Sequence, residues 1–105
     1  MTAFLQGRSS RIRGRLLDLS YTFRREGTPK FACVVSKKVV PLATGRNKVR
    51  RQVREALAPL LHGCTAPIVL VFRARETVRG AAAGELAGES CELAQAALSS
   101  YNKPI

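Results

Sequence analysis

The residues of this sequence best suited to chemistry are basic and recur at helical spacing. Between Ser36 and Glu55 the chain carries seven Lys and Arg residues but only one acid. On a helix, Arg46, Arg50 and Arg54 would form a row at i, i+4 and i+8. Solvated helices usually mix Glu with Lys to gain i,i+4 ion pairs, whereas an acid-free run repels itself. The pattern therefore indicates a helix that binds a polyanion, the alternative being an ordinary solvated charged face.

Residues able to catalyse a reaction are scarce. The acids of the basic half, Asp18, Glu26 and Glu55, are isolated, so no pair is spaced for acid–base or two-metal chemistry. His62 is the only histidine and fits packing or a dipole interaction at a helix end. No glycine-rich phosphate loop follows a strand. We expect no catalytic residue in the protein.

The cysteine pattern argues against a structural metal site. Cys33, Cys64 and Cys91 are about thirty residues apart, with no C-x₂-C spacing and no paired histidines. We therefore expect no metal ligands in the protein, and reduced thiols in a cytoplasmic chain.

The distribution of charge points to a nucleic-acid partner. The chain has 105 residues, enough for one domain, with 46% apolar and 24% charged residues. Residues 1–55 contain fourteen Lys and Arg and three acids, which accounts for the whole net charge of +11, whereas residues 56–105 contain four of each. Such an asymmetry is typical of nucleic-acid binders. No segment is apolar enough to span a membrane, and the N-terminus lacks the apolar core of a signal peptide.

Two strands are predicted in the basic half. Residues 1–7 are too few for a full helix but fit the last turns of one, ended by a glycine. Residues 16–23 alternate between apolar and polar side chains, as in a half-buried strand. Residues 31–36 are apolar enough for a central strand, and the short link between the two strands predicts antiparallel pairing.

A helix, a strand and a second helix are predicted next. The first helix starts at Pro41 or Thr44 and ends or kinks near Ala58, because a proline follows. Its apolar stripe contains Val49, Val53, Ala56, Leu57 and Leu60. Residues 66–72 form an apolar strand, which would be parallel to the preceding strand if the helix is a crossover. A final helix over residues 85–100 would lie flat on the sheet.

Two motifs closely resemble the protein subunit of bacterial ribonuclease P. The first is S-K-K-V at residues 36–39, and the second is R-N-K-V-R-R-Q-V-R-E at residues 46–55. The family pairs an S-K-K-V strand end with a downstream R-N-x-(apolar)-(basic)-R-x-(apolar)-R-(acid) helix, and this sequence fills every slot. Similarity to the family at residues 4–8 and 68–73 extends the resemblance over most of the chain.

The resemblance implies an α+β fold. The chain would be a single-domain α/β sandwich of the ribosomal protein S5 domain 2-like type, with the order αβββαβα and a left-handed βαβ crossover through the basic helix. General rules of chain connection would have predicted a right-handed crossover. The first helix would be truncated, because the chain starts just before Phe4. Residues 1–105 would form one RNA-binding domain.

The resemblance also implies a function. In this family the catalyst is the RNA subunit, which removes the 5′ leader of precursor tRNA with bound Mg²⁺, while the protein holds that RNA and the leader. The chain would be the accessory subunit of an endoribonuclease, a monomer in a 1:1 complex with ribonuclease P RNA. It would act on precursor tRNA in the cytoplasm, and the Mg²⁺ would be bound mainly by the RNA.

The resemblance and the charge pattern together indicate which residues contact RNA. The expected RNA-binding residues are Arg46, Asn47, Lys48, Arg50, Arg51, Arg54, Lys37, Lys38, Arg11 and Arg13. The leader-binding cleft, between the first helix and the sheet, is expected to contain Phe4, Arg8 and Tyr21. The family usually turns a tyrosine of the first strand toward this cleft, where this sequence offers Asp18 or Ser20. Tyr21 would substitute if the strand register shifted by one residue.

Three other classes of protein stay open at this point. A ribosome-associated or general RNA-binding chaperone module would bind structured RNA without nuclease association. A DNA-binding transcription factor would need two short helices and a tight turn, which the flanking strands disfavour. A stand-alone nuclease would need a carboxylate cluster that the sequence lacks.

Overall fold

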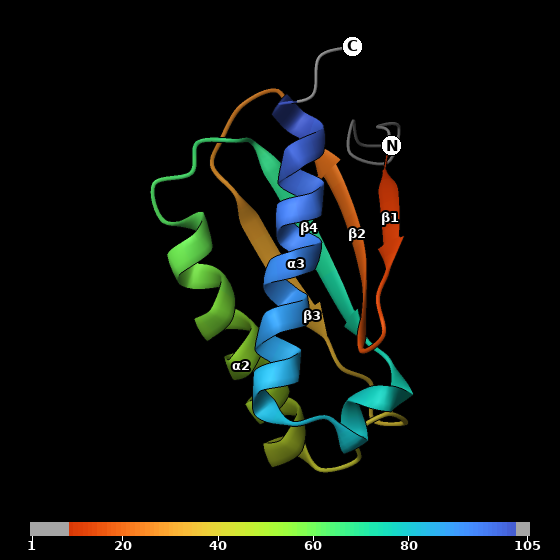
Figure 1. Ribbon diagram of the computed structural model, residues 1–105. Coiled ribbons are helices and arrows are strands. Elements are labelled where there is room, and N and C mark those ends of the chain that lie inside the picture. Colours follow the sequence, from red (N-terminus) through yellow and green to blue (C-terminus); the bar gives the residue numbers. More distant parts are fainter. Residues whose placement is uncertain (1–8, 103–105) are drawn as a thin grey trace.

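Two helices lie on one face of a four-stranded sheet in the computed structural model, which describes residues 9–102 (Figure 1). The elements are β1 (Ser10–Arg13), β2 (Leu17–Phe23), β3 (Lys30–Val34), α2 (Ala43–Leu61), β4 (Ile68–Ala74), the 3₁₀ helix η1 (Glu76–Gly80) and α3 (Ala83–Asn102). Within the described residues no helix covers the opposite face of the sheet, which we call the open face. The first helix, whose end was expected over residues 1–7, lies outside the described residues.

The strand order is β1-β2-β4-β3, so the predicted antiparallel pairing of residues 16–23 with 31–36 is wrong. β4 lies between them, antiparallel to β2 and parallel to β3, and Phe72 is opposite both Leu19 and Cys33. The central position suits β4 because Ile68, Leu70 and Phe72 are all fully buried there. The link between β2 and β3 is short, but it only has to span one additional strand spacing of about 5 Å.

The β3-α2-β4 unit is the predicted parallel crossover, and it is left-handed. In Figure 1 both strands run downward behind α2, and β4 lies to the right of β3. This hand is the rare one among βαβ units. It agrees with the fold that the family resemblance implied.

The core lies between the sheet and the two helices. Its buried members from the strands include Leu17, Leu19, Ile68, Leu70, Phe72 and Ala74, and those from the helices include Val49, Val53, Leu57, Leu86, Leu93, Ala94 and Ala97. The members from α2 recur every four residues, which confirms the predicted apolar stripe of this helix at Val49, Val53 and Leu57. The core therefore fixes which side of α2 faces solvent.

The end of α2 differs from the prediction. The helix continues through Pro59 to Leu61, and the His62 amide donates a hydrogen bond to the Ala58 carbonyl at 3.0 Å. A proline in the last turn removes only its own amide bond and leaves the rest of the helix intact. The chain turns away just beyond the helix at Gly63, whose φ of 79° is the left-handed conformation that favours glycine.

Candidate nucleic-acid interface

Helix α2 separates its charges from its apolar side chains. Val49, Val53 and Leu57 are buried against the sheet. The side facing solvent carries Lys48, Arg50, Arg51 and Arg54, which are all exposed and which we call the α2 cationic face. The first turn of the helix contains no acid, so the positive end of the helix dipole adds to this charge. The surface is therefore suited to a polyanion.

Arg46, the first arginine of the predicted row, bonds to the protein backbone. Its guanidinium donates hydrogen bonds to the carbonyls of Val40, at 3.0 Å, and Pro41, at 2.8 Å. These bonds tie the loop before α2 to the first turn of the helix, where Leu42 provides no side-chain cap. A Cβ atom on Gly45 would come within 2.8 Å of the Val40 side chain, so loop and helix pack closely. Arg46 thus positions the start of the helix.

Asn47 orients the Arg50 side chain, and the charge of Arg50 affects the pKa of Cys33. Its guanidinium donates to the Asn47 side-chain oxygen at 3.1 Å. Burial raises the pKa of the Cys33 thiol on β3 to about 11, and the nearby positive charge of Arg50 opposes that rise. Cys33 therefore stays a neutral thiol at neutral pH and is not an activated nucleophile.

The S-K-K-V motif forms the turn between β3 and α2. The Val39 amide donates to the Ser36 hydroxyl at 3.2 Å, and the Val40 amide donates to the Ser36 carbonyl at 3.0 Å. This arrangement leaves Lys37 and Lys38 exposed near the start of α2. The two predicted motifs therefore meet in space, at the end of the crossover where the helix begins.

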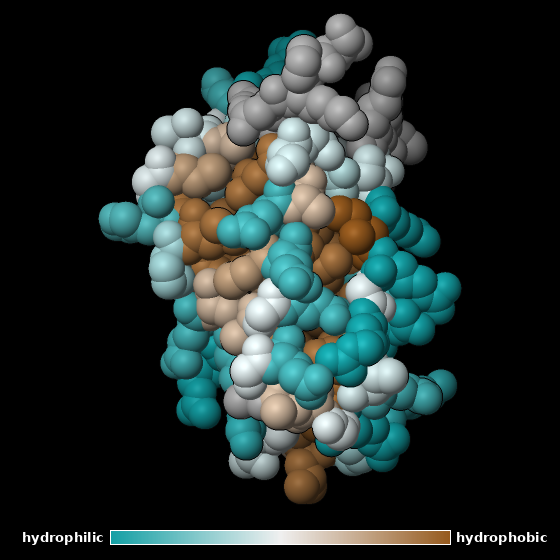
Figure 2. Space-filling model, in the orientation of Figure 1, coloured by the Kyte–Doolittle hydropathy of each residue, from teal (hydrophilic) through white to brown (hydrophobic). Residues whose placement is uncertain are grey.

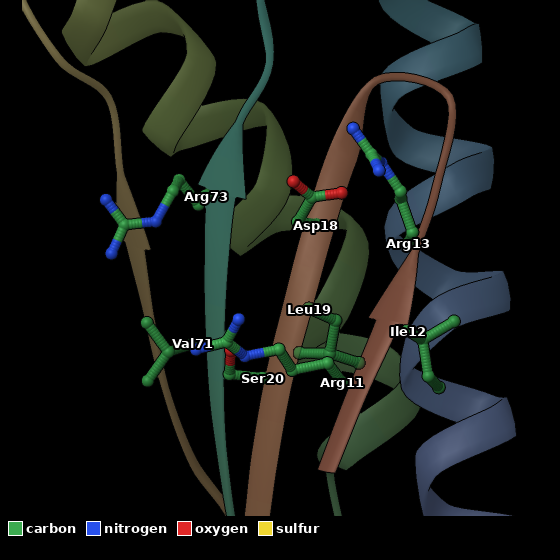
Figure 3. Close-up of a pocket in the computed structure, with 8 residues that line it drawn as sticks. All are labelled: Arg11, Ile12, Arg13, Asp18, Leu19, Ser20, Val71 and Arg73. Carbon is green, nitrogen blue, oxygen red and sulfur yellow. The ribbon is translucent and has the colours of Figure 1, made fainter.

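A second cationic surface lies on the open face. Arg11 and Arg13 of β1 are opposite Ser20 and Asp18 of β2, and Asp18 is also opposite Arg73 of β4. These five side chains, with Val71, line a hollow of about 480 Å³, which we call the open-face hollow (Figure 3). All three arginines are exposed. Figure 3 shows their side chains on the side of the sheet away from the helices.

The turn between β1 and β2 is held by Glu89 of α3. Its carboxylate accepts hydrogen bonds from the backbone amides of Arg15, at 3.2 Å, and of Leu16 and Leu17, both at 2.7 Å. A Cβ atom on Gly14 would collide with this carboxylate and would lie 2.6 Å from the Leu17 carbonyl. Helix α3 therefore sets the position of β1 and of its arginines.

The same turn is also held from its carbonyl side. Arg75 donates to the Gly14 carbonyl at 2.8 Å, and the Thr77 hydroxyl donates to the Arg15 carbonyl. The Arg15 guanidinium pairs with Glu85 at 2.8 Å. The Ala82 amide and Arg15 hold the pKa of Glu85 below its ordinary value, so this pair remains charged at neutral pH.

The structure distributes the predicted site residues over these two surfaces. Lys37, Lys38, Asn47 and the α2 cationic face lie at the crossover, while Arg11 and Arg13 lie on the open face. Phe4 and Arg8 are outside the described residues. Arg73 was not among the predicted residues; a cation directly after the apolar run of β4 was the available signal.

Tyr21 lies on the helix side of the sheet. It pairs with Leu70, its hydroxyl is 3.1 Å from the Ser100 hydroxyl of α3, and its ring packs edge-to-face on Phe23. The register shift that would have turned Tyr21 toward the open face does not occur. Asp18 and Ser20 occupy that face, as the strand alternation predicted.

The remaining surface offers fewer sites. Figure 2 shows the helix side, where apolar patches remain beside α3 and hydrophilic side chains gather along both lateral edges. Within residues 9–102, no three His, Cys, Asp or Glu side chains are grouped so that they could hold a metal ion. None of the described helices is long and apolar enough to cross a membrane.

The fold and the two surfaces define the class: a two-layer α/β protein with a left-handed crossover through a cationic helix. A family profile described as Ribonuclease P matches residues 3–97. The chain therefore belongs to the family of bacterial ribonuclease P protein components, as the two motifs predicted. Membership indicates a subunit of an endoribonuclease complex with an RNA partner subunit.

Solved structures share this fold. The ribonuclease P protein of Staphylococcus aureus is 18% identical, with a TM-score of 0.75 over 85% of this chain and 81% of that chain. A mutant of the same protein, described as defective in mRNA degradation activity, is 16% identical, with a TM-score of 0.74 over 89% and 80%. The Thermotoga maritima protein, bound to 1-(4-fluorophenyl)-2-thiourea, is 17% identical, with a TM-score of 0.72 over 87% of each chain. A comparison with curated protein sequences gives no significant match.

Proposed function

We propose that this protein binds the catalytic RNA of ribonuclease P and the 5′ leader of precursor tRNA, and so assists Mg²⁺-dependent 5′ maturation of tRNA in the cytoplasm. The observation that carries the proposal is the separation of apolar and charged side chains on α2. The valines of this helix are buried against the sheet, so its exposed cations face solvent on the opposite side. The cations of such a surface displace the counterions condensed on RNA phosphates, and the release of these ions favours binding.

The RNA subunit is the proposed partner of the α2 cationic face. Asn47 orients Arg50, while Lys37 and Lys38 extend the charge toward the end of β3. A guanidinium can bind two phosphate oxygens at once, which gives geometric as well as electrostatic selectivity. Bound Mg²⁺ supplies Lewis-acid activation for phosphodiester hydrolysis, and we place it mainly on the RNA.

The leader is the proposed partner of the open face. Arg11, Arg13 and Arg73 can neutralise the phosphates of a single strand that crosses β1, β2 and β4. Phe4 and Arg8 are proposed as further leader contacts, whereas the position of Tyr21 supports packing against α3. Helix α2 and the open face lie on opposite sides of the sheet, so a monomer could hold both RNAs in a 1:1 complex.

Salt-dependent binding tests the role of α2. Replacing both Arg50 and Arg54 by Ala should weaken binding to a bacterial ribonuclease P RNA. The slope of log affinity against log salt should become shallower by up to about 2, because each lost phosphate contact removes roughly one released counterion. Filter binding or fluorescence anisotropy at salt concentrations from about 50 to about 400 mM measures both the affinity and the slope.

A charge-matched control separates local contact from net charge. Arg24 and Arg25 are exposed in the link between β2 and β3, away from the start of α2. The Arg24→Ala, Arg25→Ala variant loses the same two charges and should keep a slope closer to that of the wild type. Equal slopes for the wild type and the α2 variant would show that this helix does not contact the RNA.

A further inference from the structure

One acid stands among the arginines of the open-face hollow. Asp18 lies on β2, directly opposite Arg13 on one side and Arg73 on the other. It forms no ion pair within 4.0 Å with either of these residues, and among the described residues its only such partner is Arg75, at 3.7 Å. Asp18 therefore does not neutralise the exposed arginines beside it by contact.

The two oxygens of Asp18 have different surroundings. Oδ1 is buried and accepts no hydrogen bond within the described part of the chain. Its neighbour Arg75 donates instead to the Gly14 carbonyl, at 2.8 Å. The Asp18 side chain is nevertheless 41% exposed, so the accessible oxygen is Oδ2. Figure 3 shows the carboxylate between Arg13 and Arg73, on the wall of the hollow.

An accessible carboxylate in this position selects for hydrogen-bond donors. A carboxylate only accepts, and it repels phosphate oxygens, so it cannot contact the backbone of a bound strand favourably. The exocyclic amino groups of cytosine (N4), adenine (N6) and guanine (N2) donate. Uracil has no amino group, and its base-edge donor, N3–H, lies between the acceptors O2 and O4, which a carboxylate repels. A nucleotide whose flanking phosphates lie on Arg13 and Arg73 would bring its base edge to Asp18, which lies between these two arginines.

We propose that Asp18 is a specificity-determining residue that accepts a hydrogen bond from the exocyclic amino group of one leader base and thereby disfavours uracil at that position. The inference rests on the proposed function, because it takes the occupant of the hollow to be the single-stranded leader. One hydrogen bond to a charged group corresponds to about a tenfold preference for cytosine over uracil.

The test uses the complete protein with a bacterial ribonuclease P RNA. Precursor tRNAs with cytosine or uracil at each leader position in turn are cleaved by the reconstituted enzyme, and kcat/KM is compared within each pair. The wild type should favour cytosine about tenfold at one position. Asp18→Asn, which keeps the shape and removes the charge, should reduce the ratio at that position to within about twofold. Glu92→Gln, the same change at an exposed position on α3, should retain the preference.

Each other outcome has a definite meaning. A uniform rise in kcat/KM for Asp18→Asn with every leader would show that the acid only repels phosphate, and would overturn the proposal. Stimulation of cleavage by the wild type without any base preference would also overturn it, while the proposed function would stand. If no leader is cleaved faster with the protein, the proposed function fails. Binding of the free protein to single-stranded C₅ and U₅ then decides the inference, with equal affinities contradicting it.

Discussion

The Cys33 thiol on β3 is a titratable group near Arg50 of α2, so its pKa reports on the burial of this region. Its pKa of about 11, against 9.0 for the ordinary thiol, means that the unfolded chain ionises first as the pH rises. The associated stability is present below pH 9 and is lost between about pH 9 and 11. Over that interval the wild type should lose about 2 kcal/mol more unfolding free energy than Cys33→Ala.

Urea unfolding between about pH 8 and about pH 11, in steps of about half a pH unit, measures the unfolding free energies of the wild type and of Cys33→Ala. Subtracting the Cys33→Ala profile removes the contributions of all other groups, because these groups are the same in both proteins. Parallel profiles for the two proteins would contradict the assigned burial of Cys33. Because the charge of Arg50 opposes the shift, Arg50→Ala should raise the pKa of this thiol further.

For individual residues, the sequence predicted correctly which face of a strand or helix a side chain occupies. It did not predict which groups that side chain contacts. The alternation of residues 16–23 placed Asp18 and Ser20 on one face and Tyr21 on the other, as observed. Helical spacing likewise separated Val53 from its charged neighbours. Spacing alone could not show that Arg46 donates to two backbone carbonyls, because those bonds depend on the path of the preceding loop.

Among the elements, the β1–β2 turn depends on one side chain from another element. Replacing Glu89 by Ala removes the acceptor of three backbone amides, two of them in part-buried surroundings. We expect a loss of about 2–3 kcal/mol and a melting temperature lower by roughly 10 °C, since unmatched donors cost about 1 kcal/mol or more each. Glu89→Gln keeps one acceptor oxygen and should lose less.

Thermal unfolding followed by circular dichroism measures these changes. Glu92→Ala, an exposed acid one turn away on α3, is the matched control and should stay within about 0.5 kcal/mol of the wild type. A wild-type melting temperature for Glu89→Ala would show that the turn does not depend on this carboxylate.

The elements themselves were mostly predictable, but their arrangement was only partly so. Hydrophobic periodicity located both helices and the strands β2, β3 and β4 to within a few residues. Periodicity missed β1 because Arg11 and Arg13 make the segment polar, although an edge strand needs only one half-buried side such as that of Ile12. The order αβββαβα that the resemblance implied does include this strand. The pairing of β2 with β4 depends on the left-handed crossover, which the motifs implied and general rules did not.

Across the whole molecule, the first half of the chain supplies the charge and the second half supplies the support. Residues 1–55 hold the net charge of +11. β4 and α3, from the second half, bury the apolar sides of β2 and α2 and fix the turn that carries β1. Two cationic surfaces on opposite sides of one sheet are the result, and the proposed function assigns a different RNA to each.

The most direct test of this account is cleavage of precursor tRNA by a bacterial ribonuclease P RNA at low Mg²⁺, with and without the protein. In the proposed function the two surfaces neutralise phosphates of both RNAs, and the protein should therefore lower the Mg²⁺ concentration that cleavage requires and raise kcat/KM. The Arg50→Ala, Arg54→Ala variant should need a higher protein concentration for the same effect. Equal cleavage with and without saturating protein would contradict the account.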